Sequence, residues 1–204
     1  MLRFVLSAAP DFALGASYLI TWISPTAAGA RSLQYLTLMA IFEFFVIHSS
    51  AFMGAVIYLG DVSRLLRALM ILGLLLFYSL FLVGISASVH EWWPVTAFCV
   101  LTLNRLTPVI FGTRPTEEQT SWQAGWAISV VLYLGWIFAT FIAPIPHLGV
   151  TSEMIAANMA KINGDWAREP YRLLAFGTGY FTSQGAVELL RGVSASRRAA
   201  PVVM

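Results

Sequence analysis

LLRALMILGLLLFYSLFLVGI, residues 65–85, is the stretch of sequence that decides the fold class. An α-helix needs about 20 apolar residues to cross the hydrocarbon core of a bilayer, and this stretch provides them with Arg67 as its one charged side chain. A run of this length is typical of a transmembrane helix, whereas a buried helix of a soluble protein is shorter. We therefore expect residues 65–88 to cross the membrane as a structural helix that faces lipid or neighbouring helices.

The composition of the whole chain agrees with this assignment. Of its 204 residues, 58% are hydrophobic and 11% are charged, and the mean hydropathy is +0.76. Soluble domains carry about 25% charged residues, so the sequence indicates an integral membrane protein with the lipid bilayer as its first partner. The formal net charge of +2 is spread over loops and ends without a dense basic run, which argues against a nucleic-acid partner.

Five further apolar segments are separated by short stretches rich in charged residues, Gly or Pro. The sequence therefore predicts an all-α, polytopic integral membrane helix bundle of about six transmembrane helices, in a single transmembrane domain that covers residues 1–204. The expected spans are residues 5–24, 33–59, 65–88, 92–111, 123–143 and 170–190. Residues 147–169 are expected to form an extramembrane surface loop that contains a short helix capped by Ser152.

The first of these segments is the weakest, because Pro10 and Asp11 interrupt it. The uninterrupted part, residues 12–24, rises only about 20 Å as a helix, which is less than the ~30 Å core. The alternative is therefore five spans plus a re-entrant or interfacial N-terminal segment. Residues 28–30 (AGA) mimic a signal-peptidase site, but the interrupted apolar run departs from the signal-peptide pattern, so we expect the segment to be retained.

Lysine and arginine residues in the short loops predict the orientation, since cytoplasmic loops carry an excess of them. With six spans, one side collects Arg3, Arg64, Arg67, Arg114, Arg191, Arg197 and Arg198, and the other collects Arg31, Lys161, Arg168 and Arg172. We therefore expect both termini on the cytoplasmic face of a bacterial-type cytoplasmic membrane.

AIFEFFVIHSSAFMGAV, residues 40–56, places Glu43 and His48 within the second span. A charge near the bilayer centre costs about 2.5–3.5 kcal/mol, so such residues face the bundle interior and find partners. Glu43 and Arg105 of the fourth span lie at depths of roughly 15 and 20 Å from the starts of their helices, which predicts an ion pair between them. His48 is turned about 140° away from Glu43 and has phenylalanines around it.

Two other spans complete the set of candidate residues. Pro108 should kink the fourth helix beside Asn104. In the sixth span a polar edge at four-residue intervals ends at Glu188, for which Arg191 is the expected partner. The predicted buried polar cluster consists of Glu43, His48, Asn104, Arg105, Tyr180, Gln184 and Glu188. Small residues at helix-packing spacing form the predicted packing faces: Ala40, Ser50, Gly54, Ala175, Gly179 and Ser183.

Three functions are compatible with these features. The favoured hypothesis is a non-catalytic accessory or assembly subunit of a larger membrane complex, bound to other membrane subunits or to copies of itself, because structural partners are available for the buried ionisable groups. The alternative is a small polar-solute or proton-coupled transporter that uses the polar cluster. The second alternative is a membrane subunit that binds haem, chlorin or quinone at His48, although the sequence identifies no cofactor.

Motifs of known catalytic and metal sites are absent from the sequence. It contains no HExxH, no GxSxG, no glycine-rich phosphate loop and no CxxC pair. We therefore expect neither catalytic residues nor a metal site, and an enzymatic function is not favoured.

Overall fold

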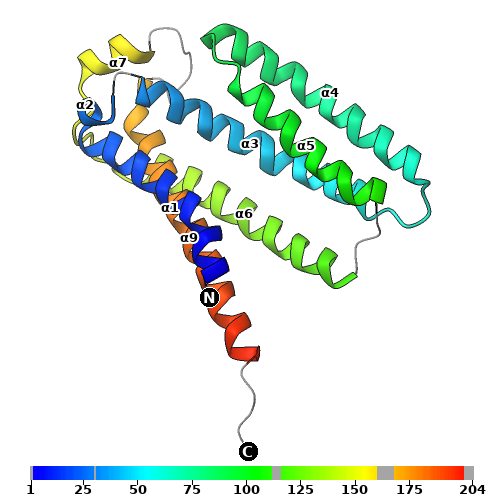
Figure 1. Ribbon diagram of the computed structural model, residues 1–204. Helices are drawn as coiled ribbons and strands as arrows, with labels where there is room; N and C mark the ends of the chain where they lie inside the picture. The colour runs from blue at the N-terminus through cyan, green and yellow to red at the C-terminus, as the bar shows by residue number, and fades with distance from the viewer. Residues whose placement is uncertain (1, 30, 112–115, 160–167, 200–204) are drawn as a thin grey trace, which may run out of the picture. The chain divides into compact units, whose positions relative to one another are not determined.

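A computed structural model describes residues 2–29, 31–111, 116–159 and 168–199, and these residues are helical throughout except for short connections (Figure 1). No strand occurs among the described residues, so the predicted all-α class is confirmed. The helices are α1 (Leu2–Ile23), α2 (Pro25–Ala28), α3 (Ser32–Ile57), α4 (Arg64–Val89), α5 (Trp93–Phe111), α6 (Thr116–Ile142), α7 (Ser152–Met159) and α9 (Pro170–Ala199).

Four of these helices contain a segment that is long and apolar enough to cross a membrane. The segments are Phe4–Ile23, Ser32–Ile57, Arg64–Val89 and Trp122–Ile142. They support an integral membrane protein built as a helix bundle. The expected count of about six spans is not confirmed, because α5 and α9 are not among the four.

The chain forms two compact units, and the boundary between them falls within α3 and within α6. Unit 1 comprises residues 1–37 and 131–204, and unit 2 comprises residues 38–130. The first therefore contains α1, α2, α7, α9 and the adjoining ends of α3 and α6. The second contains α4, α5 and the remainder of α3 and α6.

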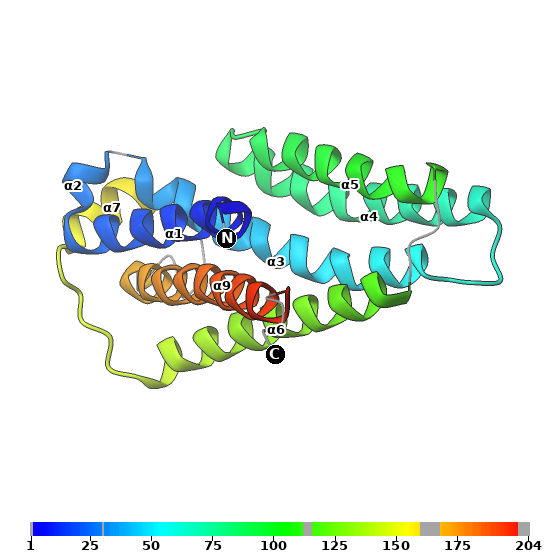
Figure 2. The same ribbon diagram turned by 60° about the horizontal axis from the view of Figure 1, so that its bottom comes forward.

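In unit 1, α1 packs along α9, and the two helices lie side by side in both ribbon views (Figures 1 and 2). The contact is close because rings of α1 lie directly over glycines of α9: a Cβ added at Gly177 would lie 2.2 Å from the Tyr18 ring, and one added at Gly185 would lie 2.9 Å from the Phe12 ring. Buried aromatic residues continue this packing, with the rings of Tyr18 and Phe181 stacked at a centroid distance of 5.5 Å.

In unit 2, α4 and α5 form an antiparallel pair (Figure 1). Their connection is short because His90 adopts the left-handed conformation (φ 59°) and donates its backbone N–H to the carbonyl of Ser86, which ends α4. The apolar core between α3, α4 and α5 contains Phe42, Met53, Val56, Ile71, Tyr78, Leu82, Phe98, Leu106 and Val109.

Two local expectations can be compared with the structure. The expected first span, residues 5–24, is helical through Pro10, since α1 runs from Leu2 to Ile23 with this proline inside it. The expected cap of the short surface helix is wrong. Ser152 is the first residue of α7 and does not cap it; the hydroxyl of Thr151 accepts a hydrogen bond from the backbone N–H of Met154 at 3.4 Å. The part of the predicted surface loop at residues 160–167 lies outside the described residues.

Candidate functional site

The half-buried guanidinium of Arg105 in unit 2 is held by three side chains of α3. Its Nη1 donates to Ser49 Oγ at 3.3 Å and to Met53 Sδ at 3.2 Å, and its Nη2 donates to Ser50 Oγ at 2.5 Å. The Ser50 hydroxyl in turn donates to the carbonyl of Val46. An arginine on one helix thus bonds to two consecutive hydroxyls on another, which satisfies three of the donor directions of a charged group inside an apolar element.

The expected ion pair between Glu43 and Arg105 is not formed. Ser50, which receives Arg105, lies seven residues beyond Glu43 and therefore on the same side of α3, but two turns further along the helix. The depth comparison assumed that the two helices start at one level, and this assumption was wrong. Glu43 is half-buried, and Asn104, the neighbour of Arg105, is exposed on α5.

His48 lies on an exposed part of α3 in unit 2 and bonds to the buried Tyr78 of α4. The distance between Tyr78 Oη and His48 Nδ1 is 2.8 Å, and Tyr78 is 3% exposed. The imidazole stacks on Phe44 at a centroid distance of 5.5 Å and contacts Phe52 edge-on at 5.3 Å. The aromatic surroundings expected from the sequence are therefore present.

Phe44, His48 and Phe52 together form an exposed aromatic surface of α3, which we call the His48 face. The two phenylalanines are 46% and 50% exposed. In whichever tautomer the ring exists, Nδ1 is engaged by Tyr78, and Nε2 offers one further hydrogen bond or a metal bond. Within the part of unit 2 that the structure describes, nothing bonds to Nε2.

The remaining predicted cluster residues lie in unit 1, on α9. Gln184 Nε2 donates to Tyr180 Oη at 2.9 Å, and Tyr180 is fully buried. Glu188 Oε1 accepts a hydrogen bond from Ser7 Oγ of α1 at 3.1 Å, so its partner is on the neighbouring helix, whereas Arg191 was expected. The predicted polar cluster is therefore divided: Glu43, His48, Asn104 and Arg105 belong to unit 2, and Tyr180, Gln184 and Glu188 belong to unit 1.

Asp11 is a functional candidate that sequence reasoning missed. The half-buried Asp11 carboxylate interacts electrostatically with Glu188, so two acidic side chains from α1 and α9 lie near one another beside Ser7. The sequence interpretation used Asp11 only as a break in the first apolar segment. Its position inside a helix that is able to span a membrane was the signal that an ionisable residue there needs an explanation.

A tryptophan ring covers one of the predicted packing glycines in each unit. The ring of Trp122 lies where a Cβ of Gly54 would be, and that of Trp136 lies over Gly179. Trp136 Nε1 also donates to Ser183 Oγ at 3.0 Å. Of the other predicted positions, Ala40 and Ala175 are buried.

A polar group at the start of α9 in unit 1 was also missed. Arg172 forms a salt bridge with Glu169, and its Nη1 donates to the carbonyl of Thr140 at 2.5 Å in the last turn of α6. The hydroxyl of Tyr171 is the main cause, ahead of Arg172, of a lowered pKa of the exposed Glu169 carboxyl. The Tyr171 ring stacks on His147 at a centroid distance of 4.0 Å. The arrangement supplies a cation to the C-terminal carbonyls of α6, which stabilises that helix end.

Among the described residues, no group of three or more His, Cys, Asp or Glu side chains is arranged to hold a metal ion. The hydrogen bonds of the polar groups described above each join residues of one unit. No protein-family model matches the chain, and neither a curated protein nor a solved structure shows similarity to it.

Proposed function

We propose that this chain is a non-catalytic accessory or assembly subunit of a larger membrane complex, and that it binds a transmembrane helix of another subunit through the His48 face. It would reside in a bacterial-type cytoplasmic membrane with both termini cytoplasmic. The observation that carries the proposal is the exposed imidazole of His48, whose Nδ1 is bonded to Tyr78 while no described residue of unit 2 bonds to Nε2.

The physical argument rests on the cost of a polar group in hydrocarbon. α3 is one of the four helices able to cross a membrane, and His48 lies well inside it. A polar atom left without a partner in an apolar medium costs about 1–3 kcal/mol or more. A hydrogen-bonding side chain on a partner helix would remove this cost at Nε2. The adjacent rings of Phe44 and Phe52 provide apolar contact area around that bond.

The test is purification of the full chain from its native membrane in a mild detergent. We expect an integral membrane subunit to co-migrate in a fixed ratio. His48→Phe keeps an aromatic ring but removes both ring nitrogens, and should weaken the association about 5- to 10-fold, the equivalent of one hydrogen bond. Phe52→Ala should weaken it too, whereas Phe138→Ala, which removes a 62% exposed ring from α6 in unit 1, should not.

A homogeneous, colourless monomer whose behaviour is unaffected by His48→Phe would contradict the proposal. Visible absorption that disappears in His48→Phe would instead favour the alternative in which Nε2 of His48 binds haem or chlorin. A quinone that co-purifies with the wild type and is lost from His48→Phe would favour the same alternative, a cofactor-binding subunit, with quinone as the cofactor.

A second candidate function, proton-coupled transport of a small polar solute, is favoured by the acidic pair of Asp11 and Glu188. Carboxylates on neighbouring membrane helices are frequent elements of proton relays. Ser7 and, one turn before Glu188 on α9, Gln184 extend the polar groups on this side of unit 1. In proteoliposomes, this function predicts a pH-gradient-dependent uptake that is lost in Asp11→Asn and Glu188→Gln while the proteins still assemble. Impaired assembly without any flux in the wild type would support the accessory role.

A further inference from the structure

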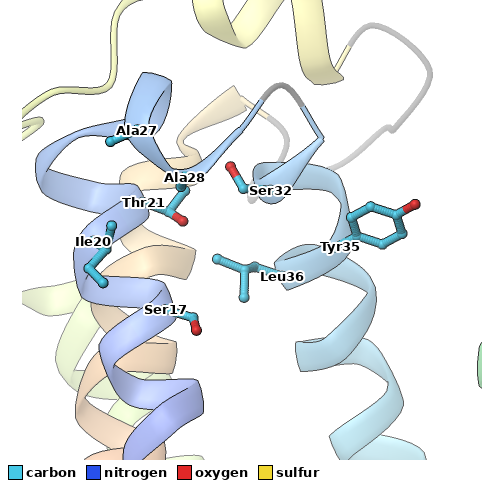
Figure 3. A pocket seen from close by; sticks show the side chains of 8 residues that line it. All are labelled: Ser17, Ile20, Thr21, Ala27, Ala28, Ser32, Tyr35 and Leu36. Carbon is cyan, nitrogen blue, oxygen red and sulfur yellow. The ribbon is translucent and has the colours of Figure 1, made fainter.

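A pocket of about 340 Å³ lies in unit 1 between the end of α1, α2 and the start of α3 (Figure 3). Its volume is within the range of small-molecule sites, which begins near 300 Å³. Ser17 of α1 and Tyr35 of α3 are among the residues that line it. Ser17 lies six residues before the end of α1, so the pocket reaches about 9 Å along that helix from its end.

Thr21 is the residue that points to a ligand. Its side chain is 1% exposed and lines the pocket, and Figure 3 shows Thr21 of α1 and Leu36 of α3 directed toward one another across it. Threonines in helices commonly donate to the carbonyl four residues earlier, as Thr37 does to Leu33 at 2.8 Å. Within the described residues Thr21 makes no such bond, and its hydroxyl has no protein partner.

Two further hydroxyls of the pocket, those of Ser17 and Ser32, help to define what a ligand must offer. Ser17 donates to the carbonyl of Ala13 at 2.8 Å, and Ser32 donates to the carbonyl of Gly29 at 2.9 Å. Each hydroxyl has therefore used its donor and retains acceptor lone pairs, whereas the Thr21 hydroxyl can still donate. No charged side chain is among the lining residues, and Ile20, Ala27, Ala28 and Leu36 supply an apolar wall.

From these observations we propose that the pocket binds an uncharged amphiphile whose polar end carries a hydroxyl or a carbonyl oxygen. The oxygen accepts a hydrogen bond from Thr21, and a ligand hydroxyl donates to Ser17 or Ser32. The apolar part of the ligand lies against the alanines of α2 and Leu36. A carboxylate or phosphate would be desolvated there without a cationic partner, so charged lipids are disfavoured. Monoacylglycerols and quinones share the acceptor oxygen required by Thr21, and a monoacylglycerol also has hydroxyls that can donate to Ser17 or Ser32.

The test uses the purified full chain in detergent and three named probes: 1-monooleoylglycerol, decyl-ubiquinone and oleate. We expect one or both uncharged probes to raise the melting temperature in a saturable manner, and oleate to have no such effect. The probe that binds identifies the source of the ligand. Stabilisation by oleate alone, or by none of the three, would overturn the proposal.

Matched variants place the binding in this pocket. Thr21→Val keeps the shape of the side chain but removes the hydroxyl, and should weaken binding of the active probe about 2- to 10-fold. Thr140→Val makes the same change at another buried threonine of unit 1, 1% exposed and outside the pocket, and should leave binding unchanged. Ala28→Phe should fill the pocket and abolish binding. Equal effects of the two threonine variants would contradict the assignment.

The pocket belongs to unit 1 and the His48 face to unit 2, so the two proposals fail separately. His48→Phe should leave probe binding unchanged, and Thr21→Val should leave the co-migrating subunit in place.

Discussion

Arg105 shows how hydrogen bonds to a few side chains stabilise a charged residue within an apolar helix. Two hydroxyls and a thioether of α3 receive the guanidinium, without a carboxylate. Hydrogen bonds to charged groups contribute about 1.5–3 kcal/mol each, which is comparable to the cost of a charge near the bilayer centre. The serines are therefore the residues that allow Arg105 to remain in the interior of unit 2.

Ser50→Ala should lower the free energy of unfolding by about 1.5–3 kcal/mol, because it removes one hydrogen bond of a charged group and leaves that donor unsatisfied. Denaturant titration in detergent measures the change. Ser88→Ala is the matched control: Ser88 is exposed, bonds only to the carbonyl of Ile85, and should change stability by less than about 0.5 kcal/mol. Similar losses in the two variants would refute the role of Ser50.

Glu169 should make the stability of the protein depend on pH, and the sign of this dependence follows from the lowered pKa of its carboxyl. The interactions with Tyr171 and Arg172 favour the charged carboxylate of Glu169. Their contribution to stability is therefore fully present above the ordinary pKa of 4.5, and it is lost as the pH falls through the lower pKa of the folded state. Below 4.5, the melting temperature of the wild type should fall more steeply than that of Glu169→Gln. High salt should reduce the difference, because the group is exposed. Parallel pH profiles would show that the interaction does not contribute.

At the residue scale, the sequence allowed correct predictions where the interaction is local. The phenylalanines four residues before and after His48 were expected around it, because positions four apart share a helix face. Tyr78, which lies 30 residues away along the chain, was not expected, because helical phase contains no information about the register of two helices. The ion pair of Arg105 with Glu43 was predicted wrongly for the same reason, because the sequence does not show the register of α3 and α5.

Helix α1 illustrates at the element scale how tertiary packing overrides a local signal. Pro10 and Asp11 read as an interruption in the sequence, yet the helix continues through them. A proline inside a helix removes one backbone hydrogen bond, at a cost of about 3 kcal/mol. Close packing on α9 supplies the compensating contacts, with Tyr18 over Gly177 and Phe12 over Gly185. Such contacts could not be predicted because they depend on which glycines of α9 meet which rings of α1.

Gly15→Ala tests the packing of α1 on α9, and Gly73→Ala on α4 is the control with the same substitution. A Cβ at Gly15 would lie 3.2 Å from the backbone nitrogen of Thr182, so we expect a loss of about 1–3 kcal/mol from overpacking. A Cβ at Gly73 of α4 meets no atom within 4 Å, so alanine should be neutral or stabilise the helix by up to about 1 kcal/mol. Thermal unfolding in detergent compares them. A stable Gly15→Ala variant would mean that α1 and α9 do not pack this closely.

For the whole molecule, composition was sufficient to predict the membrane class, but it was not sufficient to predict the number of crossings. Of the six expected spans, four satisfy the length and hydropathy required of a span, and the described residues of α5 and α9 do not. Both carry polar groups that the structure places in contact with other helices, Arg105 on α5 and Glu188 on α9. Polar residues that bond within a bundle lower the hydropathy of a helix without showing whether it crosses.

Cysteine labelling from outside the cell decides between six and four crossings. Cys99, the single cysteine, is first replaced by serine, and Ser152→Cys and Ser194→Cys are introduced separately at exposed positions after α6 and within α9. With cytoplasmic termini and six spans, an impermeant maleimide should label position 152 in intact cells and position 194 only after permeabilisation. If neither α5 nor α9 crosses, both positions should be protected until permeabilisation. Failure of α9 alone would expose both positions, and failure of α5 alone would expose only position 194, so each pattern corresponds to one set of spanning helices.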